Sequence, residues 1–107
     1  MALLHISTKQ DFQQKVLQSS KPVLVDFFAT WCGPCKIMEP VLTEVATEMP
    51  EVDVVKVDVD SSSDIASEYN ISSIPTFLVF SNGEVVSQSV GAVGKAQIKK
   101  MVATVGK

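Results

Sequence analysis

The chain has 107 residues, of which 46% are hydrophobic, and a formal net charge of -3 at pH 7. This length and hydrophobic content suffice for one core, so we expect a single domain over residues 1–107. The acidic balance gives no support to binding of nucleic acid or an anionic membrane, which a basic surface would favour. The N-terminus resembles no leader, and no apolar run reaches about 18 residues, so we expect a cytoplasmic protein.

The N-terminal residues predict a strand followed by a helix. Leu3–Ile6 has a short strand pattern, and Ser7 and Gln10 have the spacing of a capping box that opens a helix. The apolar positions of that helix share one face: Phe12, Val16 and Leu17. Residues 22–28 are then almost continuously apolar, which indicates a central strand covered on both faces.

The strongest helix pattern covers residues 34–49. Its apolar positions repeat at intervals of three and four, as in a helix that packs on a sheet. These positions are Ile37, Met38, Val41, Leu42, Val45, Ala46 and Met49. Pro40 lies inside the pattern and removes one backbone hydrogen bond, so we expect the helix to bend there and to continue.

Another strand and a short helix follow. Residues 51–59 alternate well enough for a strand. Residues 61–64 are three serines and an aspartate, which offer several caps for a helix that ends near Asn70.

The last third of the chain predicts a hairpin and a helix. The strand patterns 76–80 and Glu84–Val90 are joined through Asn82 and Gly83, and Asn-Gly is a strong hairpin signal. An amphipathic helix over 95–105 would then cover the sheet. Its inward positions are Ile98, Met101, Val102 and Val105.

The element order is therefore βαβαβαββα. Crossovers through helices imply parallel strands, and the hairpin adds antiparallel ones. The expected fold class is α/β, with a central mixed sheet of five strands flanked by four helices. Ligands of such sheets meet the carboxyl ends of the strands, and residues 31–35 directly follow the end of the central strand.

Cys32 and Cys35 are the only cysteines, and they lie where the central strand gives way to the long helix. Unpaired backbone N–H groups and the positive end of the helix dipole favour a thiolate at Cys32, the expected nucleophile. Cys35 would be more covered by protein, as suits a resolving thiol. Gly33 leaves room for a substrate backbone, and Pro34 is tolerated in a first helical turn.

Cys-x-x-Cys pairs also occur in zinc sites and in structural bridges. Tetrahedral zinc needs four ligands, whereas the chain has two cysteines and one histidine, His5, so we expect no metal site. His5 is more simply an ordinary strand or surface residue. A structural disulfide over so short a loop removes little entropy from the unfolded chain, so dithiol chemistry is the favoured interpretation.

The run Trp31-Cys32-Gly33-Pro34-Cys35-Lys36, after an apolar strand that carries Asp26, resembles the thioredoxin family. The resemblance covers nearly the whole chain and includes further residues: Lys56, Ile74-Pro75-Thr76, Gly83 and Gly91. It implies the thioredoxin fold and a general protein-disulfide reductase. In that chemistry Cys32 attacks a substrate disulfide, and Cys35 resolves the mixed disulfide and leaves an oxidised pair.

Asp26 and Lys56 are charged residues inside apolar strands, where an unpaired charge is costly. We expect burial to raise the pKa of Asp26, and the matching buried acid of the family suggests that it takes the proton from Cys35. If their strands are adjacent, Lys56 would approach Asp26 and moderate that pKa. The alternatives are an outward-facing Asp26, and a Lys56 whose stem packs inward while its ammonium reaches water.

Ile74 and Pro75 stand before a strand. The resemblance implies a cis Ile74-Pro75 bond facing the cysteines, with the Ile74 backbone pairing with an extended substrate segment. An apolar surface for protein substrates would then comprise Trp31, Gly33, Pro34, Ile74, Pro75, Gly91 and Ala92. A place in the core is the alternative for Trp31, and a bulge or strand end is the alternative for Gly91.

The resemblance also implies a monomer with no bound cofactor, active in electron transport and cell redox homeostasis. Its partners would be protein disulfides and a flavoprotein thioredoxin reductase that supplies electrons from NADPH. Two alternatives use a similar fold: a disulfide oxidase or isomerase, and a redox-inert binding module. The dipeptide Gly33-Pro34 argues against the oxidase.

Overall fold

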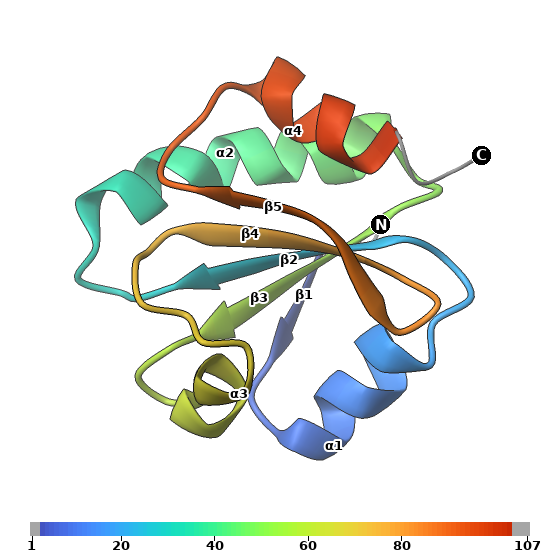
Figure 1. Ribbon diagram of the computed structural model, residues 1–107. Helices are drawn as coiled ribbons and strands as arrows, with labels where there is room; N and C mark the ends of the chain where they lie inside the picture. The colour runs from blue at the N-terminus through green and yellow to red at the C-terminus, as the bar shows by residue number, and fades with distance from the viewer. Residues whose placement is uncertain (1–2, 104–107) are drawn as a thin grey trace.

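The computed structural model describes residues 3–103 (Figure 1). Its elements are β1 (Leu3–Ile6), α1 (Lys9–Phe12), η1 (Gln13–Leu17), β2 (Val23–Phe28), α2 (Gly33–Glu48), β3 (Asp53–Asp58), α3 (Ser63–Glu68), β4 (Thr76–Ser81), β5 (Glu84–Val90) and α4 (Lys95–Ala103). The segment η1 is a π-helical continuation of α1. The predicted order βαβαβαββα is confirmed, with α1 and η1 together forming the first helical segment.

The five strands form one mixed sheet in the order β1-β3-β2-β4-β5. The neighbours β1, β3 and β2 are parallel, whereas β4 is antiparallel to both β2 and β5. The strand before the cysteines, β2, therefore lies at the centre. In its register, Asp26 stands opposite Lys56 of β3 and Phe77 of β4.

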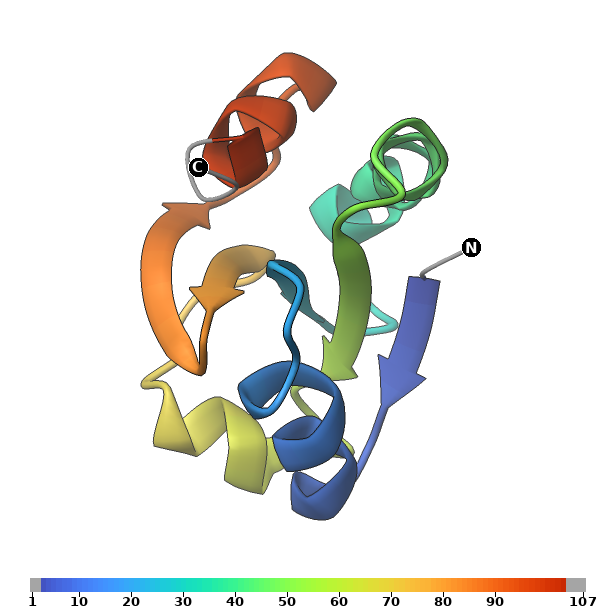
Figure 2. The same ribbon diagram turned by 90° about the vertical axis from the view of Figure 1, so that its right-hand side faces the viewer.

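Helices cover both faces of the sheet, with α2 and α4 on one side and α1, η1 and α3 on the other (Figures 1 and 2). Alternation along β2 divides its side chains between two cores. Val25 and Phe27 pack with Phe12 and Val16 of the first helical segment. Leu24 packs with residues of α2 and α4, among them Met38, Leu42, Ile98 and Met101. Asp26 follows Leu24 by two positions and so faces the layer that contains α2.

The long helix α2 continues through Pro40, as predicted. Its buried residues are Cys35, Met38, Leu42, Val45 and Ala46. The inward position predicted for Ile37 is wrong, since that side chain is 66% exposed. Successive residues are rotated by about 100° around a helix, which places Ile37 outside the buried stripe that contains Cys35, Met38 and Leu42.

The prediction for the first helix cap is also wrong in its residue. Thr8 is the N-cap of α1, and its Oγ1 accepts a 3.0 Å hydrogen bond from the Asp11 N–H. The carbonyl of Ser7 instead accepts a 3.0 Å bond from the hydroxyl of Ser62, the N-cap residue of α3. Ser7 therefore connects β1 to a distant segment, a contact that local spacing does not reveal.

The hairpin between β4 and β5 turns at Asn82 and Gly83, as predicted. Both residues have positive φ, 53° and 81°, which is the conformation that two-residue hairpins require. The described part of α4 ends at Ala103, so the inward position predicted for Val105 lies outside the described residues. Between residues 3 and 103, no helix is long and apolar enough to cross a membrane.

Candidate functional site

Cys32 and Cys35 are joined by a disulfide at the junction of β2 and α2, with their Cα atoms 5.3 Å apart. Cys32 is the N-cap of α2, and its sulfur accepts a 3.2 Å hydrogen bond from the Cys35 N–H. The Cys32 N–H donates to the Ala29 carbonyl at 3.2 Å, which ties the loop to the end of β2. The helix N-terminus therefore directs a backbone donor at the sulfur of Cys32.

The two cysteines are almost equally buried. Cys32 is 4% exposed and Cys35 is 2% exposed, so Cys35 is the more covered, but by little. Both pack with Ala29, and Phe28, Val59 and Ile74 border this small cluster. The sulfurs differ chiefly in their hydrogen bonding, because it is the Cys32 Sγ that receives the amide of the first helical turn.

Asp26 lies on β2, on the face of the sheet that α2 covers, and is fully buried. Within residues 3–103, neither of its carboxylate oxygens has a hydrogen-bond partner. Desolvation raises the pKa of Asp26 to about 7; the positive charge of Lys56 opposes this shift and the negative charge of Glu39 adds to it. The alternative of an outward-facing, solvated Asp26 is therefore wrong.

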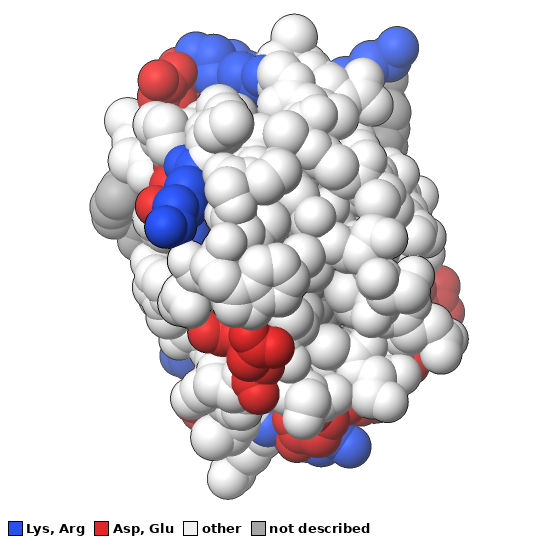
Figure 3. Space-filling model, turned by 90° about the vertical axis from the view of Figure 1, so that its left-hand side faces the viewer, with Lys and Arg blue, Asp and Glu red and all other residues white. Residues whose placement is uncertain are grey.

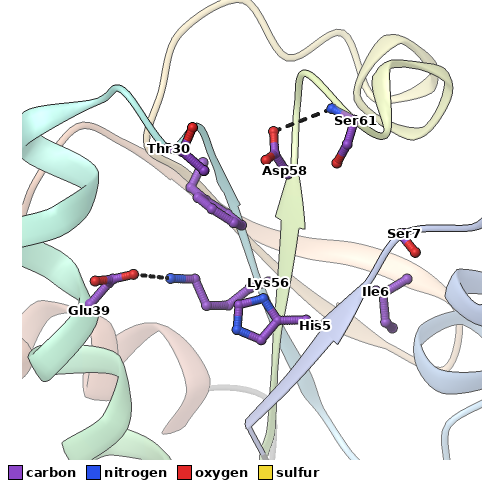
Figure 4. Close-up of a pocket in the computed structure, with 9 residues that line it drawn as sticks. His5, Ile6, Ser7, Thr30, Glu39, Lys56, Asp58 and Ser61 are labelled. Atoms are coloured by element: carbon purple, nitrogen blue, oxygen red, sulfur yellow. Dashed lines mark hydrogen bonds and ion pairs between the residues drawn. The ribbon is translucent and has the colours of Figure 1, made fainter.

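Lys56 is 4% exposed and points from β3 toward α2 (Figure 4). Its Nζ lies 3.9 Å from Oδ2 of Asp26 and 3.2 Å from Oε2 of Glu39. The same ammonium lies 4.4 Å from the centre of the Phe28 ring, within the range of a cation–π contact. The Lys56 ammonium therefore does not extend into bulk water, as the alternative expected. It also makes no close ion pair with Asp26.

A pocket of about 420 Å³ opens beside this group of charges. Its lining comes from β1, the β2–α2 junction, α2, β3 and the segment after β3 (Figure 4): His5, Ile6, Ser7, Phe28, Thr30, Glu39, Lys56, Asp58 and Ser61. His5 stands opposite Lys56 in the strand register and makes an edge contact with the Phe28 ring. Among residues 3–103, no group of three His, Cys, Asp or Glu side chains is arranged to hold a metal ion.

Trp31 lies on the surface, with 69% of its side chain exposed, so a place in the core is wrong. Its Nε1 donates a 2.7 Å hydrogen bond to Oδ2 of Asp60. A hollow of about 180 Å³ beside the indole is lined by Trp31, Val59, Ile71, Ser72, Ser73 and Ile74. Sequence reasoning missed Val59, Asp60 and residues 71–73, because their approach to Trp31 depends on how two later loops fold back.

The Ile74-Pro75 bond is cis, as the resemblance implied. The Pro75 carbonyl accepts a 2.7 Å hydrogen bond from the Gly91 N–H, which joins the start of β4 to the end of β5. Gly91 has a φ of 93°, so it terminates β5 in a conformation suited to glycine. Ala92, the next residue, is exposed.

The residues predicted as a contact surface fall at the end of the sheet where β2 passes into α2. Trp31, Gly33 and Pro34 are exposed there, Ile74 is half-buried beside the cysteines, and Pro75 is buried. Figure 3 views the molecule from this side and shows a broad area of uncharged residues, with most charged side chains above, beside and below it.

A disulfide-bonded cysteine pair at the N-terminus of the helix that follows the central strand, together with a buried acid on that strand, is the arrangement of a thiol–disulfide oxidoreductase. The family model for thioredoxin matches residues 3–104. A thioredoxin from Mycobacterium tuberculosis is 48% identical over 99 residues, which cover 92% of this chain and 85% of that protein.

Two further relatives agree. A bifunctional thioredoxin reductase/thioredoxin from Mycobacterium leprae is 50% identical over 92 residues, which cover 85% of this chain and 20% of that longer protein. The oxidised form of mitochondrial thioredoxin 3 from Saccharomyces cerevisiae superposes with a TM-score of 0.88 at 33% identity, covering 95% of this chain and 94% of that one. The chain belongs to the thioredoxin family, and its Cys32–Cys35 pair carries out thiol–disulfide exchange.

Proposed function

We propose that the chain reduces protein disulfides with Cys32 as the attacking sulfur and Cys35 as the resolving one. The hydrogen bond from the Cys35 N–H to the Cys32 Sγ carries this assignment. An amide donor at a helix N-terminus stabilises negative charge on the sulfur that accepts it, and the thiolate is the nucleophile.

Two exchanges complete one cycle. The Cys32 thiolate attacks one sulfur of a substrate disulfide, forms a mixed disulfide and expels the other substrate sulfur as a thiolate, which takes a proton from water. The Cys35 thiol then gives its proton to a base and attacks the Cys32 sulfur. This second step breaks the mixed disulfide, releases the second substrate thiolate and leaves the Cys32–Cys35 bond. Two electrons pass from the protein to the substrate.

Asp26 is the proposed base for the Cys35 proton. Its pKa of about 7 lets it hold or release a proton near neutral pH, as a general base requires. Asp26 faces the α2 layer, from which Cys35 also points into the protein. Lys56 supports this role, because its positive charge limits the cost of ionising a fully buried carboxyl.

Protein substrates would bind across the uncharged surface formed by Trp31, Gly33, Pro34, Ile74, Pro75, Gly91 and Ala92. Exposed Trp31 offers a large apolar contact, and the hollow between it and Ile74 has room for one substrate side chain. The backbone of Ile74, just before β4, would pair with an extended substrate segment that bears the disulfide.

The oxidised pair would be recharged by an NADPH-dependent flavoprotein thioredoxin reductase, with no cofactor bound to this chain. The fused reductase/thioredoxin relative from Mycobacterium leprae supports this electron source. We place the protein in the cytoplasm, where thiols are kept reduced, and take it to work as a single domain and as a monomer.

Trapping of the mixed disulfide tests the order of the two cysteines. The variant Cys35→Ser should accumulate a covalent complex with a disulfide-bonded protein such as insulin, visible on a non-reducing gel, because the resolving thiol is absent. The matched variant Cys32→Ser should form none. Equal trapping by both variants, or trapping by Cys32→Ser alone, would refute the assignment.

A second measurement separates the reductase from the two alternatives. Equilibration with a glutathione buffer at pH 7 should give a reduction potential of about -270 mV, the value typical of thioredoxin, and not about -180 to -120 mV as in disulfide isomerases and oxidases. The double variant Cys32→Ser, Cys35→Ser should lose all biological activity, whereas a redox-inert binding module would keep it.

A further inference from the structure

The Lys56 ammonium lies between two carboxylates and is shared unequally. It makes a 3.2 Å hydrogen bond to Glu39 Oε2, whereas its distance to Asp26 Oδ2 is 3.9 Å, too long for a hydrogen bond. Asp26 is fully buried and Glu39 has 58% of its side chain exposed. The buried acid, which gains more from a counter-ion, therefore has the weaker contact.

Glu39 reaches Lys56 from the helix that carries the cysteines. It lies four residues after Cys35 on α2, about one helical turn further along the same side. Figure 4 shows the Glu39 carboxylate directed across the pocket at the ammonium, which extends from β3. The position of α2 therefore sets both the location of the resolving sulfur and the direction in which Lys56 points.

We propose that Glu39 is a positioning residue of the dithiol centre: it holds the Lys56 ammonium at the pocket, so that Asp26 lacks a close ion pair and retains its proton. This inference rests on the proposed role of Asp26 as the base for Cys35. Glu39 acts in two ways that have the same sign. It draws the ammonium away from Asp26, and its own negative charge opposes ionisation of Asp26.

Other charged groups near this pair do not replace Glu39. His5 of β1 and Asp58 of β3 line the same pocket as Lys56. Asp58 accepts hydrogen bonds from the backbone of Asp60 and Ser61. The lysines of α4 that pack against α2, Lys95 and Lys99, are held by Glu44 and Glu48. Among these groups, Glu39 is the carboxylate bonded to Lys56.

The test is the titration of Asp26 in the oxidised protein, followed through its carboxyl carbon by NMR. In Glu39→Gln the midpoint should fall by about one pH unit, because Lys56 is released toward Asp26 and a like charge is removed. Glu39→Asp keeps the charge on a shorter side chain, so its Asp26 midpoint should lie between those of the parent protein and Glu39→Gln. Glu44→Gln is the matched control: that side chain is 57% exposed on the same helix but pairs with Lys95, and the midpoint should not move.

The rate at which Cys35 resolves a mixed disulfide provides the functional readout. Its rise with pH should move to lower pH in Glu39→Gln by the same interval as the Asp26 titration, so that resolution at pH 6 is several-fold faster. In a Lys56→Met background, removal of Glu39 should shift the Asp26 midpoint much less, because no ammonium remains to be redirected.

An Asp26 midpoint that is unchanged or raised in Glu39→Gln would overturn the inference. An equal shift with and without Lys56 would also overturn it, since Glu39 would then act without positioning the ammonium. The titration needs no substrate, so it is independent of the proposed function. Absence of any mixed disulfide with Cys32 would refute the proposed function, whereas a normal exchange reaction with an unmoved Asp26 midpoint would refute the role of Glu39 alone.

Discussion

Asp26 and Lys56 stand opposite each other on adjacent parallel strands, yet the closest distance between their charged atoms is 3.9 Å. Strand register brings the two residues together, and α2 then draws the ammonium toward Glu39. The result is a buried carboxyl with a positive charge nearby and no hydrogen bond to it from residues 3–103. This arrangement combines a raised pKa with continued access to the ionised form.

Asp26→Asn should stabilise the protein at neutral and alkaline pH. The pKa of Asp26 rises from 3.8 to about 7 on folding, so the folded state binds this proton more tightly than the unfolded state. Stability therefore falls as pH rises from about 4 to about 7, and a shift of this size corresponds to about 4 kcal/mol at most. We expect urea unfolding of Asp26→Asn at pH 8 to show a gain of a few kcal/mol.

The gain should shrink to well under about 1 kcal/mol near pH 4, where Asp26 is protonated in the folded state and about half protonated in the unfolded state. Glu51→Gln is a suitable control, because Glu51 is exposed and its substitution should change stability little at either pH. A stability difference between Asp26→Asn and the parent protein that is the same at pH 4 and pH 8 would contradict the assignment of the raised pKa.

Trp31→Ala should impair reduction of protein disulfides more than it impairs folding. The indole is 69% exposed, so truncation should change the free energy of unfolding by less than about 1 kcal/mol. Loss of a large aromatic contact at a binding surface should lower kcat/KM for a protein disulfide about tenfold. Exchange with oxidised glutathione, which is too small to span this surface, should change much less.

Asp60→Ala tests whether the indole must be held in place. Its carboxylate accepts the Trp31 Nε1 hydrogen bond at 2.7 Å, and its loss should free the ring and reduce kcat/KM for the protein substrate by a smaller factor, about two- to fivefold. Trp31 fluorescence anisotropy should fall in the same variant. Asp60→Asn retains an acceptor oxygen and should behave like the parent protein.

Gly83→Ala should destabilise the β4–β5 hairpin. Gly83 has a φ of 81°, and an added Cβ would lie 3.0 Å from the backbone oxygen of Leu17. A left-handed conformation costs a side-chain-bearing residue about 1–2 kcal/mol, and the close contact adds to that. Gly94→Ala is the control, because the φ of Gly94 is not in the left-handed region and an added Cβ there would meet open space. Equal midpoints of thermal unfolding for the two variants would argue against this account.

Glu48→Gln should weaken the contact between α2 and α4 in a salt-dependent way. Hydrogen bonds from Lys95 and Lys99 lower the pKa of Glu48 to about 2. A lowered carboxyl pKa stabilises the folded state above the unfolded pKa of 4.5, and this stabilisation disappears as pH falls through about 2. The variant should therefore unfold at lower urea concentration than the parent protein at pH 7, differ from it progressively less as pH falls toward 2, and lose most of the difference in high salt.

The chain's order of elements could be predicted because each has a strong local cause. Continuous apolar residues marked β2, three-and-four spacing marked α2, and Asn82-Gly83 marked the hairpin. Errors arose where a neighbouring segment decided the outcome. Ser7 bonds to Ser62 and leaves the cap to Thr8, and Ile37 keeps the helical spacing of its neighbours but lies outside the stripe that meets the sheet.

The candidate site shows the same division. The cysteine pair and the buried acid have local sequence signals, since a charge among Val, Leu and Phe residues is unusual. Glu39 has none, because it is one of several acids on the exposed side of a helix. The hydrogen bond between Lys56 and Glu39 depends on the lateral position of α2 over β3. The hydrogen bond between Trp31 and Asp60 likewise depends on how the loop after β3 folds.

The sheet also separates the aromatic core from the charged residues around Asp26. The aromatic core formed by Phe12, Tyr69 and Phe80 lies on the face opposite α2, away from Asp26 and Lys56. Substitutions among these aromatic residues can therefore change stability without contact with Asp26 or Lys56. A substitution at Asp26, by contrast, should change stability and disulfide exchange together.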